Sequence, residues 1–262
     1  MERPFLVVAL CHTLRRTCTS PRPTTVSRIM DAIFAGLKIA DTHSDLYRNI
    51  VSLRSQEDLY DDLSDDPNDW QRAIELELKT QPATYISHTP IIHRPFEEAA
   101  WDEAIGFPFR EWSRSRYSDG SFGVWYGSDT IDTTIHETVH HWRNTLLADA
   151  GFSAAGIKIE RRVHLVRCDA VLMDLRSLAT LHPMLINTND YTVTHQVGGR
   201  LHREGHPGLV TASARCPGDV YAVLNPAVLS NPRSNCYLTY TTTENGVDVE
   251  RVPGELLLTV TC

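Results

Sequence analysis

Two overlapping sets of reactive side chains occur within one short stretch of the sequence. The run His136-Glu137-Thr138-Val139-His140 has the HExxH spacing, in which two histidines on one helical face bind zinc and the glutamate acts as general base. The second set is Arg116, Tyr126 ten residues later, and Glu137 eleven residues after that tyrosine. In this set the glutamate would instead stabilise positive charge on a ribose while an N-glycosidic bond breaks. The role of Glu137 therefore decides the chemistry.

The zinc interpretation requires a third ligand. Glu160 lies 24 residues after His136, which is a workable spacing, but it falls in the alternating run 157–163. Alternation predicts a strand, whereas the third ligand of such a peptidase normally comes from a second helix. Because the chain has 12 histidines among 262 residues, an HExxH match by chance is not rare. We expect half-exposed helix histidines and no bound metal, and keep a zinc metallopeptidase as an alternative.

The elements that must position these residues are predicted to form an α+β domain. An apolar stripe predicts a helix from a cap at Ser128 or Asp129 to about Leu147. Glu137 lies about 200° around this helix from Ile135, so it points away from the stripe. The other expected elements are a helix over residues 192–203 and strands over residues 91–94, 123–126, 163–166, 171–175, 208–210 and 220–224.

The N-terminal part is predicted to be helical and separate from the sheet. From about Ile29 to Leu78, apolar residues recur at three- and four-residue spacing. Residues 1–29 are expected to be a disordered lead-in, with Met30 as an alternative start. The apolar run 5–10 is too short to span a membrane and lacks a good signal-peptide cleavage site. The predicted organisation is a lead-in over 1–29, a helical region over 30–82 and a catalytic domain over 83–262.

Composition narrows the classes of partner and compartment. The formal net charge is -8 and no run of five basic residues occurs, which argues against direct nucleic-acid binding. The six cysteines include no C-x-x-C pair, so reduced thiols in a cytoplasm are expected. We do not expect the chain to bind a membrane, and the sequence does not decide whether it forms a homo-oligomer.

In their shared order, the residues of the second set and several downstream segments resemble the RES-domain family over residues 91–230. The similarity rests on Arg116 with the strand 123–126 behind it, on the helix that carries Glu137, and on residues 208–215 before Asn225-Pro226. The chain has Ser-Arg-Tyr-Ser at 115–118 where the family often has Gly-Arg-Trp-Asn. The resemblance implies an ADP-ribosyltransferase-like fold with a mixed or antiparallel sheet. It also implies a toxin of the Xre-RES toxin–antitoxin type that destroys NAD by hydrolysis or phosphorolysis, and an Xre-type antitoxin partner.

The residue types fit that chemistry even without the family resemblance. Glu137 is the predicted stabiliser of the ribosyl cation, and Arg116 suits a pyrophosphate because guanidinium binds phosphate oxygens in pairs. Tyr126, at a strand end, is expected to stack on the nicotinamide or ribose, and Ser213 to hydrogen-bond the substrate. These four are the predicted catalytic residues. The predicted substrate-binding residues are Arg94, Tyr117 and Arg215.

The way the chain would use NAD also follows from a missing motif. The sequence has no G-x-G-x-x-G after a strand, so a dehydrogenase that recycles NAD is not expected. NAD would be a substrate rather than a cofactor, with water or inorganic phosphate as the second reactant. Two alternatives remain beside the peptidase: transfer of ADP-ribose to a protein, and a binding module that has lost catalysis.

Overall fold

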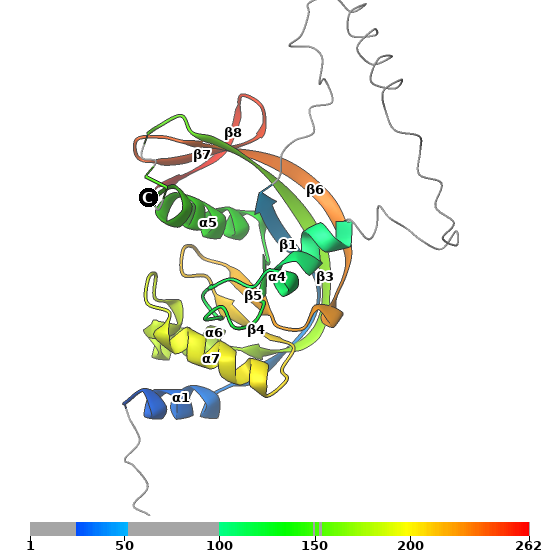
Figure 1. Cartoon of the computed structure of the whole chain (residues 1–262), viewed down its shortest axis with the longest axis vertical. Helices are drawn as coiled ribbons and strands as arrows, with labels where there is room; N and C mark the ends of the chain where they lie inside the picture. The colour runs from blue at the N-terminus through cyan, green and yellow to red at the C-terminus, as the bar shows by residue number, and fades with distance from the viewer. Residues whose placement is uncertain (1–24, 52–99, 149, 152–153, 262) are drawn as a thin grey trace, which may run out of the picture.

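The computed structural model describes residues 25–51, 100–148, 150–151 and 154–261 (Figure 1). Several predictions lie outside these residues: the lead-in up to residue 24, the helical pattern from residue 52 to Leu78, the strand at 91–94, and Arg94 as a substrate-binding residue. None of the described helices is long and apolar enough to cross a membrane.

A single mixed sheet dominates the described part of the chain, with the strand order β1-β2-β5-β4-β3-β6-β7-β8. Strands β3 and β4 pair in parallel, and the other neighbours are antiparallel. The strands are β1 (Lys38–Val51), β2 (Trp125–Ser128), β3 (Lys158–Asp174), β4 (Gly208–Ala212), β5 (Asp219–Val223), β6 (Leu229–Thr242), β7 (Gly246–Val252) and β8 (Glu255–Thr261). The predicted α+β class with a mixed sheet is confirmed.

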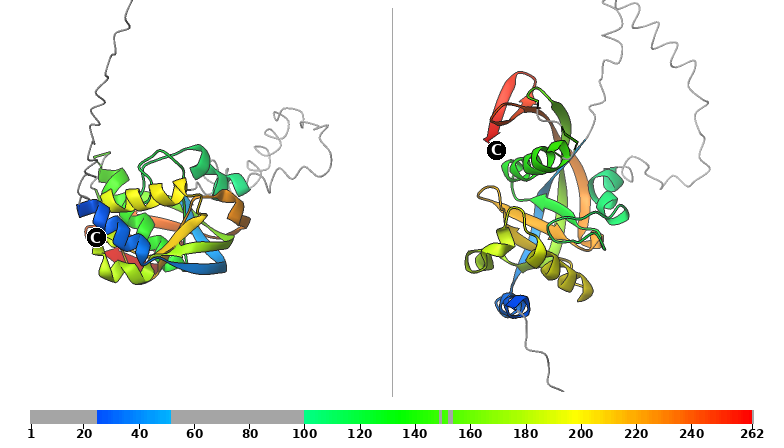
Figure 2. Two further views of the ribbon diagram at one scale, coloured as in Figure 1. Left: turned by 90° about the horizontal axis from the view of Figure 1, so that it is seen from below. Right: turned by 60° about the vertical axis from the view of Figure 1, so that its left-hand side comes forward.

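The sheet is strongly curved, and α5 and α7 lie on its inner side with β4 and β5 between them (Figure 1). The second view places α1 beside α7 (Figure 2), which agrees with the contacts between these two helices. The helical segments are α1 (Thr25–Ala35), the π-helical turn η1 (Asp102–Gly106), α4 (Phe107–Arg110), α5 (Ile131–His141), its π-helical continuation η2 (Trp142–Leu147), α6 (Arg176–Leu181), η3 (Pro183–Ile186), α7 (Thr192–Arg203) and η4 (Pro226–Val228).

The predicted N-terminal helical region is corrected by strand β1. Only α1 is helical, and residues 38–51, expected to continue a helical pattern, pair with β3 from Lys38 opposite Asp174 to Val51 opposite Arg161. Long antiparallel pairing outweighs the weak stripe that Leu46 and Ile50 suggested, because strand formation is decided mainly by neighbouring strands. The N-terminal segment is thus part of the main sheet.

Helix α1 also corrects the predicted extent of the lead-in. The helix begins at Thr25 and not after Ile29. Ile29 and Met30 pack against the buried cluster that contains Ile33 and Leu201. Residues 25–29 therefore contribute a packed helical turn rather than a disordered segment.

Helix α5 packs on the sheet through its apolar face and is capped at its N-terminus. Ile135 and Val139 are fully buried against strands β3 and β6. The side chain of Thr130 caps the helix by accepting a bond from the Thr133 backbone N–H, one residue beyond the predicted cap. The apolar stripe packs the helix on the sheet, so the opposite side, which carries Glu137, remains partly exposed.

Candidate active site

The centre of the candidate site is a contact between a carboxylate and a hydroxyl. Ser213 Oγ donates a hydrogen bond of 2.6 Å to Glu137 Oε1, and only 8% of Ser213 is exposed. Glu137 comes from α5, whereas Ser213 follows β4, so the fold joins two distant parts of the sequence. The bond fixes the orientation of the Glu137 carboxylate and leaves its second oxygen for another partner. Two predicted catalytic residues are thereby brought together.

The turn after β4 is built around the Ser213 hydroxyl. Ser213 Oγ accepts bonds from the backbone N–H groups of Arg215, at 3.0 Å, and of Cys216, at 3.4 Å. Gly218 closes the turn with a φ of 151°, and a Cβ at this position would lie 2.1 Å from Thr133 Oγ1 of α5. Glycine is therefore required for the turn to approach α5 closely enough for the Ser213–Glu137 bond.

Strand β1 fixes α5 beneath this contact. Asn49 Nδ2 donates to the Tyr240 hydroxyl at 2.9 Å, and that hydroxyl lies 2.9 Å from Thr138 Oγ1, next to Glu137. Arg161 Nε donates to Asn49 Oδ1 at 2.6 Å. A buried network whose groups are bonded to one another is rigid, so it holds the helix in one orientation. The sequence interpretation missed Asn49 because it placed residues 38–51 in a helix.

Arg116 and Arg215 both bond to one short segment between η3 and α7. Arg116 Nη1 donates to the Asn187 carbonyl at 2.7 Å, and Arg215 Nη2 donates to the Thr188 carbonyl at 2.8 Å. The Arg116 guanidinium also lies over the ring of Tyr191, 4.8 Å from its centroid. The structure thus brings Arg116, predicted to bind the pyrophosphate, and Arg215, predicted to bind the substrate, to the same segment.

The charges of this group interact with the Glu137 carboxylate. Burial lowers the pKa of Arg215, the carboxylate of Glu137 opposes this shift, and the charge of Arg116 adds to it. Burial also lowers the pKa of His140, and Arg215 lowers it further, whereas Glu137 raises it. Glu137, Arg116, Arg215 and His140 therefore form one electrostatic group at the exposed side of α5.

The Tyr126 hydroxyl is bonded to the loop that carries Arg116. It accepts a bond of 2.9 Å from the Tyr117 backbone N–H and donates one of 3.0 Å to Ser115 Oγ. Burial raises the pKa of Tyr126, so the hydroxyl stays protonated. These bonds hold the loop on both sides of Arg116. Tyr126 is half-buried, so its predicted stacking role stays a prediction beside this contact with the arginine loop.

Tyr117 belongs to the core. Its side chain is 0% exposed and packs with Leu209 and Val197. A side chain without exposed surface does not contact a ligand, so the predicted substrate-binding role of Tyr117 is corrected. Its position next to Arg116 in sequence suggested the role, but the Tyr117 side chain is fully buried whereas Arg116 is only half-buried.

The residues of the zinc interpretation have other partners. His140 Nδ1 lies 2.8 Å from Asn144 Nδ2, and Glu160 accepts a 2.8 Å bond from Thr239 Oγ1 within the sheet. Glu160 lies in β3, as its alternating context predicted. Across the described ranges, no three His, Cys, Asp or Glu side chains are grouped as a metal-binding set. No observation here favours the peptidase.

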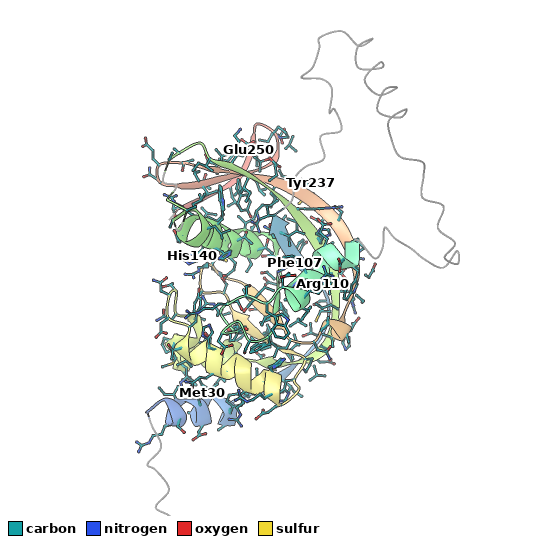
Figure 3. All side chains as sticks on the ribbon, viewed as in Figure 1. Met30, Phe107, Arg110, His140, Tyr237 and Glu250 are labelled. Atoms are coloured by element: carbon teal, nitrogen blue, oxygen red, sulfur yellow. The ribbon has the colours of Figure 1, made fainter. Side chains whose placement is uncertain are left out.

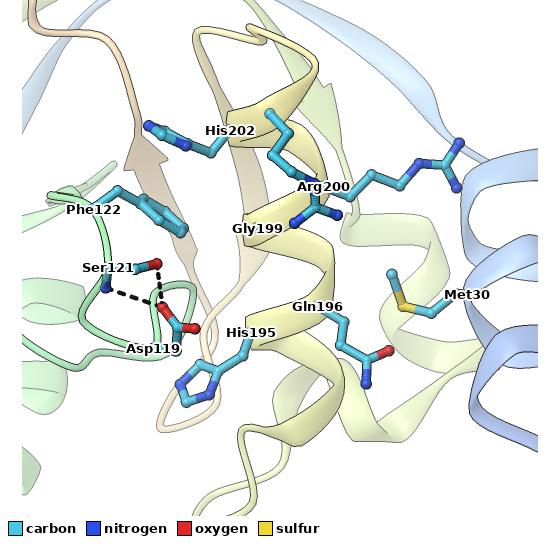
Figure 4. Close-up of a pocket in the computed structure, with 10 residues that line it drawn as sticks. Met30, Asp119, Ser121, Phe122, His195, Gln196, Gly199, Arg200 and His202 are labelled. Carbon is cyan, nitrogen blue, oxygen red and sulfur yellow. Dashed lines mark hydrogen bonds between the residues drawn. The ribbon is translucent and has the colours of Figure 1, made fainter.

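A separate pocket, with a volume of ≈ 540 Å³, is lined mainly by residues of α7 (Figure 4). Asp119, Ser121 and Phe122 line it from one loop, α7 contributes residues that include His195, and Met30 lies at its far side. Neither Glu137 nor Ser213 lines this pocket. We place the candidate active site at the carboxylate–hydroxyl pair, because a hollow without such a pair offers less for bond cleavage.

The fold and these residues agree with a sequence match to a known family. The chain belongs to the RES-domain family, whose sequence model, described as RES domain, matches residues 88–243. Strands β1, β7 and β8 lie outside the matched residues.

Individual proteins were also compared with the chain. No curated protein matches the chain. Among solved structures, the chain is similar to one in the crystal structure of the M. tuberculosis MbcT-MbcA toxin-antitoxin complex. The TM-score is 0.40 and the identity 12%, over 79% of this chain and 91% of the other.

Proposed function

We propose that this chain is a toxin-type enzyme that degrades NAD by cleaving its nicotinamide N-glycosidic bond. The single observation that carries the proposal is the Ser213–Glu137 pair beside two arginines that have a common anchoring segment. Membership in the RES-domain family supports the same conclusion. Tyr117 has no part in the chemistry, and NAD acts as the substrate, not as a cofactor.

The proposed reaction uses the arrangement of the carboxylate. The bond between the ribose C1′ and the nicotinamide nitrogen breaks, and its electron pair leaves with the nicotinamide. The carboxylate of Glu137, oriented by Ser213, stabilises the positive charge left on the ribose. A water molecule or a phosphate oxygen then adds to C1′, and water loses a proton in this step. Arg116 and Arg215 hold the pyrophosphate of the substrate.

Product analysis tests the proposal and separates the second reactants. Purified protein is incubated with NAD, with and without inorganic phosphate. Free nicotinamide with ADP-ribose indicates hydrolysis, and ADP-ribose phosphorylated at the anomeric carbon indicates phosphorolysis. Labelling of a protein by ADP-ribose would favour the transferase alternative. NAD that stays intact under all conditions would contradict the proposal.

The proposal extends to a protein partner. The family resemblance implies an Xre-type antitoxin, and the similar M. tuberculosis chain comes from a complex described as toxin and antitoxin. In a bacterium, expression of this chain is expected to lower the NAD pool and stop growth, and a partner that covers Glu137 and Arg116 is expected to prevent both. Arrested growth with a normal NAD level would contradict NAD degradation as the cause.

A further inference from the structure

Tyr191, at the end of the segment before α7, contacts both arginines of the candidate site. Its ring lies beneath the Arg116 guanidinium at 4.8 Å. Its hydroxyl donates at 3.4 Å to the Thr188 carbonyl, the group that also accepts from Arg215 Nη2. Tyr191 also opposes the lowering of the Arg215 pKa that burial causes. The side chain therefore contacts the Arg116 guanidinium and shares an acceptor with Arg215.

The segment that carries Tyr191 is fixed by its own side chains. Asn187 Oδ1 accepts bonds of 2.9 Å from the backbone N–H groups of Asn189 and Asp190. Asp190 Oδ1 accepts a 2.9 Å bond from the Thr192 N–H, at the start of α7. This leaves the successive carbonyls of Asn187 and Thr188 in fixed positions, and they hold the two guanidiniums side by side.

Most hydrogen-bond donors of the two guanidiniums are not used by these carbonyls. Each guanidinium has five N–H groups. Among the described residues, neither Arg116 nor Arg215 forms an ion pair with a carboxylate within 4.0 Å. Arg215 Nε is buried and makes no hydrogen bond with the described residues. Two adjacent cations with spare donors fit an anion that carries charge on two neighbouring groups.

We propose that Tyr191 is a positioning residue that pairs Arg116 with Arg215 and makes the site selective for a diphosphate over a monophosphate. This inference rests on the proposed function, since it assigns the diphosphate to the pyrophosphate of NAD. The tyrosine ring offsets the repulsion between the guanidiniums through its contact with Arg116. Two linked phosphates can give each guanidinium its own phosphate group, whereas a single phosphate must share its oxygens between both guanidiniums.

The test compares NAD with nicotinamide mononucleotide, which has the same scissile bond and one phosphate. We expect the ratio of their kcat/KM values to fall about tenfold in Tyr191→Ala, through a higher KM for NAD, as the loss of a cation–π contact predicts. Tyr191→Phe keeps the ring and is expected to retain the ratio, whereas Tyr191→Leu keeps the bulk and is expected to lose it. Tyr191→Leu also replaces the alanine variant if the latter does not fold.

A tyrosine on the sheet, outside the candidate site, provides a matched control. Tyr237 of β6 also lies beneath an arginine, with Arg162 at 5.5 Å from its ring centroid, and lies far from His140 in Figure 3. Tyr237→Ala is expected to leave the ratio unchanged. An equal loss for both substrates in Tyr191→Ala and Tyr191→Leu would indicate a general structural role and overturn the proposal. The same holds if Tyr191→Phe behaves as the alanine variant.

A binding measurement separates this inference from the proposed function. Calorimetry with ADP-ribose and with AMP compares a diphosphate and a monophosphate that both contain adenosine, and no bond cleavage is needed. We expect tighter binding of ADP-ribose by the wild-type chain and loss of that preference in Tyr191→Leu. This result without NAD cleavage would contradict the proposed function and keep the diphosphate site. Equal preference in both proteins would overturn the diphosphate site.

Discussion

The side chains around Glu137 fix the orientation of its carboxylate and set the charge around it. Ser213 fixes one carboxylate oxygen, and Arg116 and Arg215 supply positive charge nearby. His140 is held toward its neutral form, because burial and Arg215 lower its pKa. In the proposed reaction, a carboxylate that is held in one orientation would stabilise the developing cation.

The planar shape of Arg116 gives a prediction at the residue scale. Arg116→Lys keeps the charge but loses the paired N–H groups and the flat contact with Tyr191, so we expect kcat/KM for NAD to fall by at least about tenfold. Steady-state kinetics on NAD measures this effect. Arg110 of α4, which pairs with Asp102, is the matched control, and Arg110→Lys is expected to retain activity. Equal activity of the two variants would remove Arg116 from the site.

The residues of the site were only partly predictable from the sequence. Glu137, Arg116 and Ser213 were found because their types and their order match a known pattern. Tyr191 was missed because a lone aromatic in a loop carries no periodic signal, and only the fold places it beneath Arg116. Tyr117 was overinterpreted, since its place beside Arg116 in the sequence does not reveal that its side chain is buried in the core.

At the scale of elements, the close approach of α7 to the Arg116 loop depends on one glycine. A Cβ at Gly198 would lie 1.9 Å from the Tyr117 carbonyl oxygen. Gly198→Ala must therefore push the helix and the loop apart, and we expect a loss of about 1–3 kcal/mol in the free energy of unfolding, together with lower activity. Urea denaturation measures the loss.

The neighbouring glycine provides the control for this prediction. At Gly199 an added Cβ would meet only the flexible end of Arg203, at 3.4 Å. Gly199→Ala is expected to be neutral or to stabilise the helix by up to about 1 kcal/mol, because alanine favours helices. If both variants had the same stability, the close packing of α7 against the loop would be wrong.

Helix α1 gives a second prediction at this scale. A chain that begins at Met30 lacks the first turn of α1 and Ile29, which packs against the core. Compared with a chain that begins at Thr25, we expect it to lose about 1 kcal/mol of stability from the apolar area that is no longer buried. Thermal unfolding of the two chains compares them directly. Identical unfolding curves would restore the expectation that residues 25–29 add nothing.

Elements differ in how well the sequence predicts them, and the reason is physical. Helices α5 and α7 were predicted well because each has an amphipathic pattern and a defined end. Strand β1 was not, because its partner β3 lies more than a hundred residues further along the chain and no local pattern reports such pairing. Two predicted short strands, at 163–166 and 171–175, are likewise parts of the one long strand β3, which ends at Asp174.

For the whole molecule, a buried histidine predicts a pH dependence of stability. His164 is 1% exposed, neither of its ring nitrogens has a hydrogen-bond partner among the described residues, and burial lowers its pKa below 6.5 although Glu103 opposes this. Protonation therefore favours the unfolded chain, so the stability that His164 contributes is complete above pH 6.5 and is lost as the pH falls below it.

Urea midpoints across the range from neutral to mildly acidic pH test this dependence. Relative to the wild-type chain, His164→Leu is expected to show a shallower fall in stability below pH 6.5, because the leucine has no proton to gain. An unchanged slope would show that His164 does not control the acid response.

The central claim, that Glu137 drives cleavage of NAD, is tested most directly by the release of nicotinamide. Purified wild-type chain and Glu137→Gln are incubated with NAD at equal concentration, with Glu244→Gln, a change at an exposed residue, as the control. We predict release by the wild-type and control chains, and a loss of about two to four decades in kcat for Glu137→Gln at unchanged melting temperature. Release by Glu137→Gln at the wild-type rate, or none by the wild-type chain, would contradict the account.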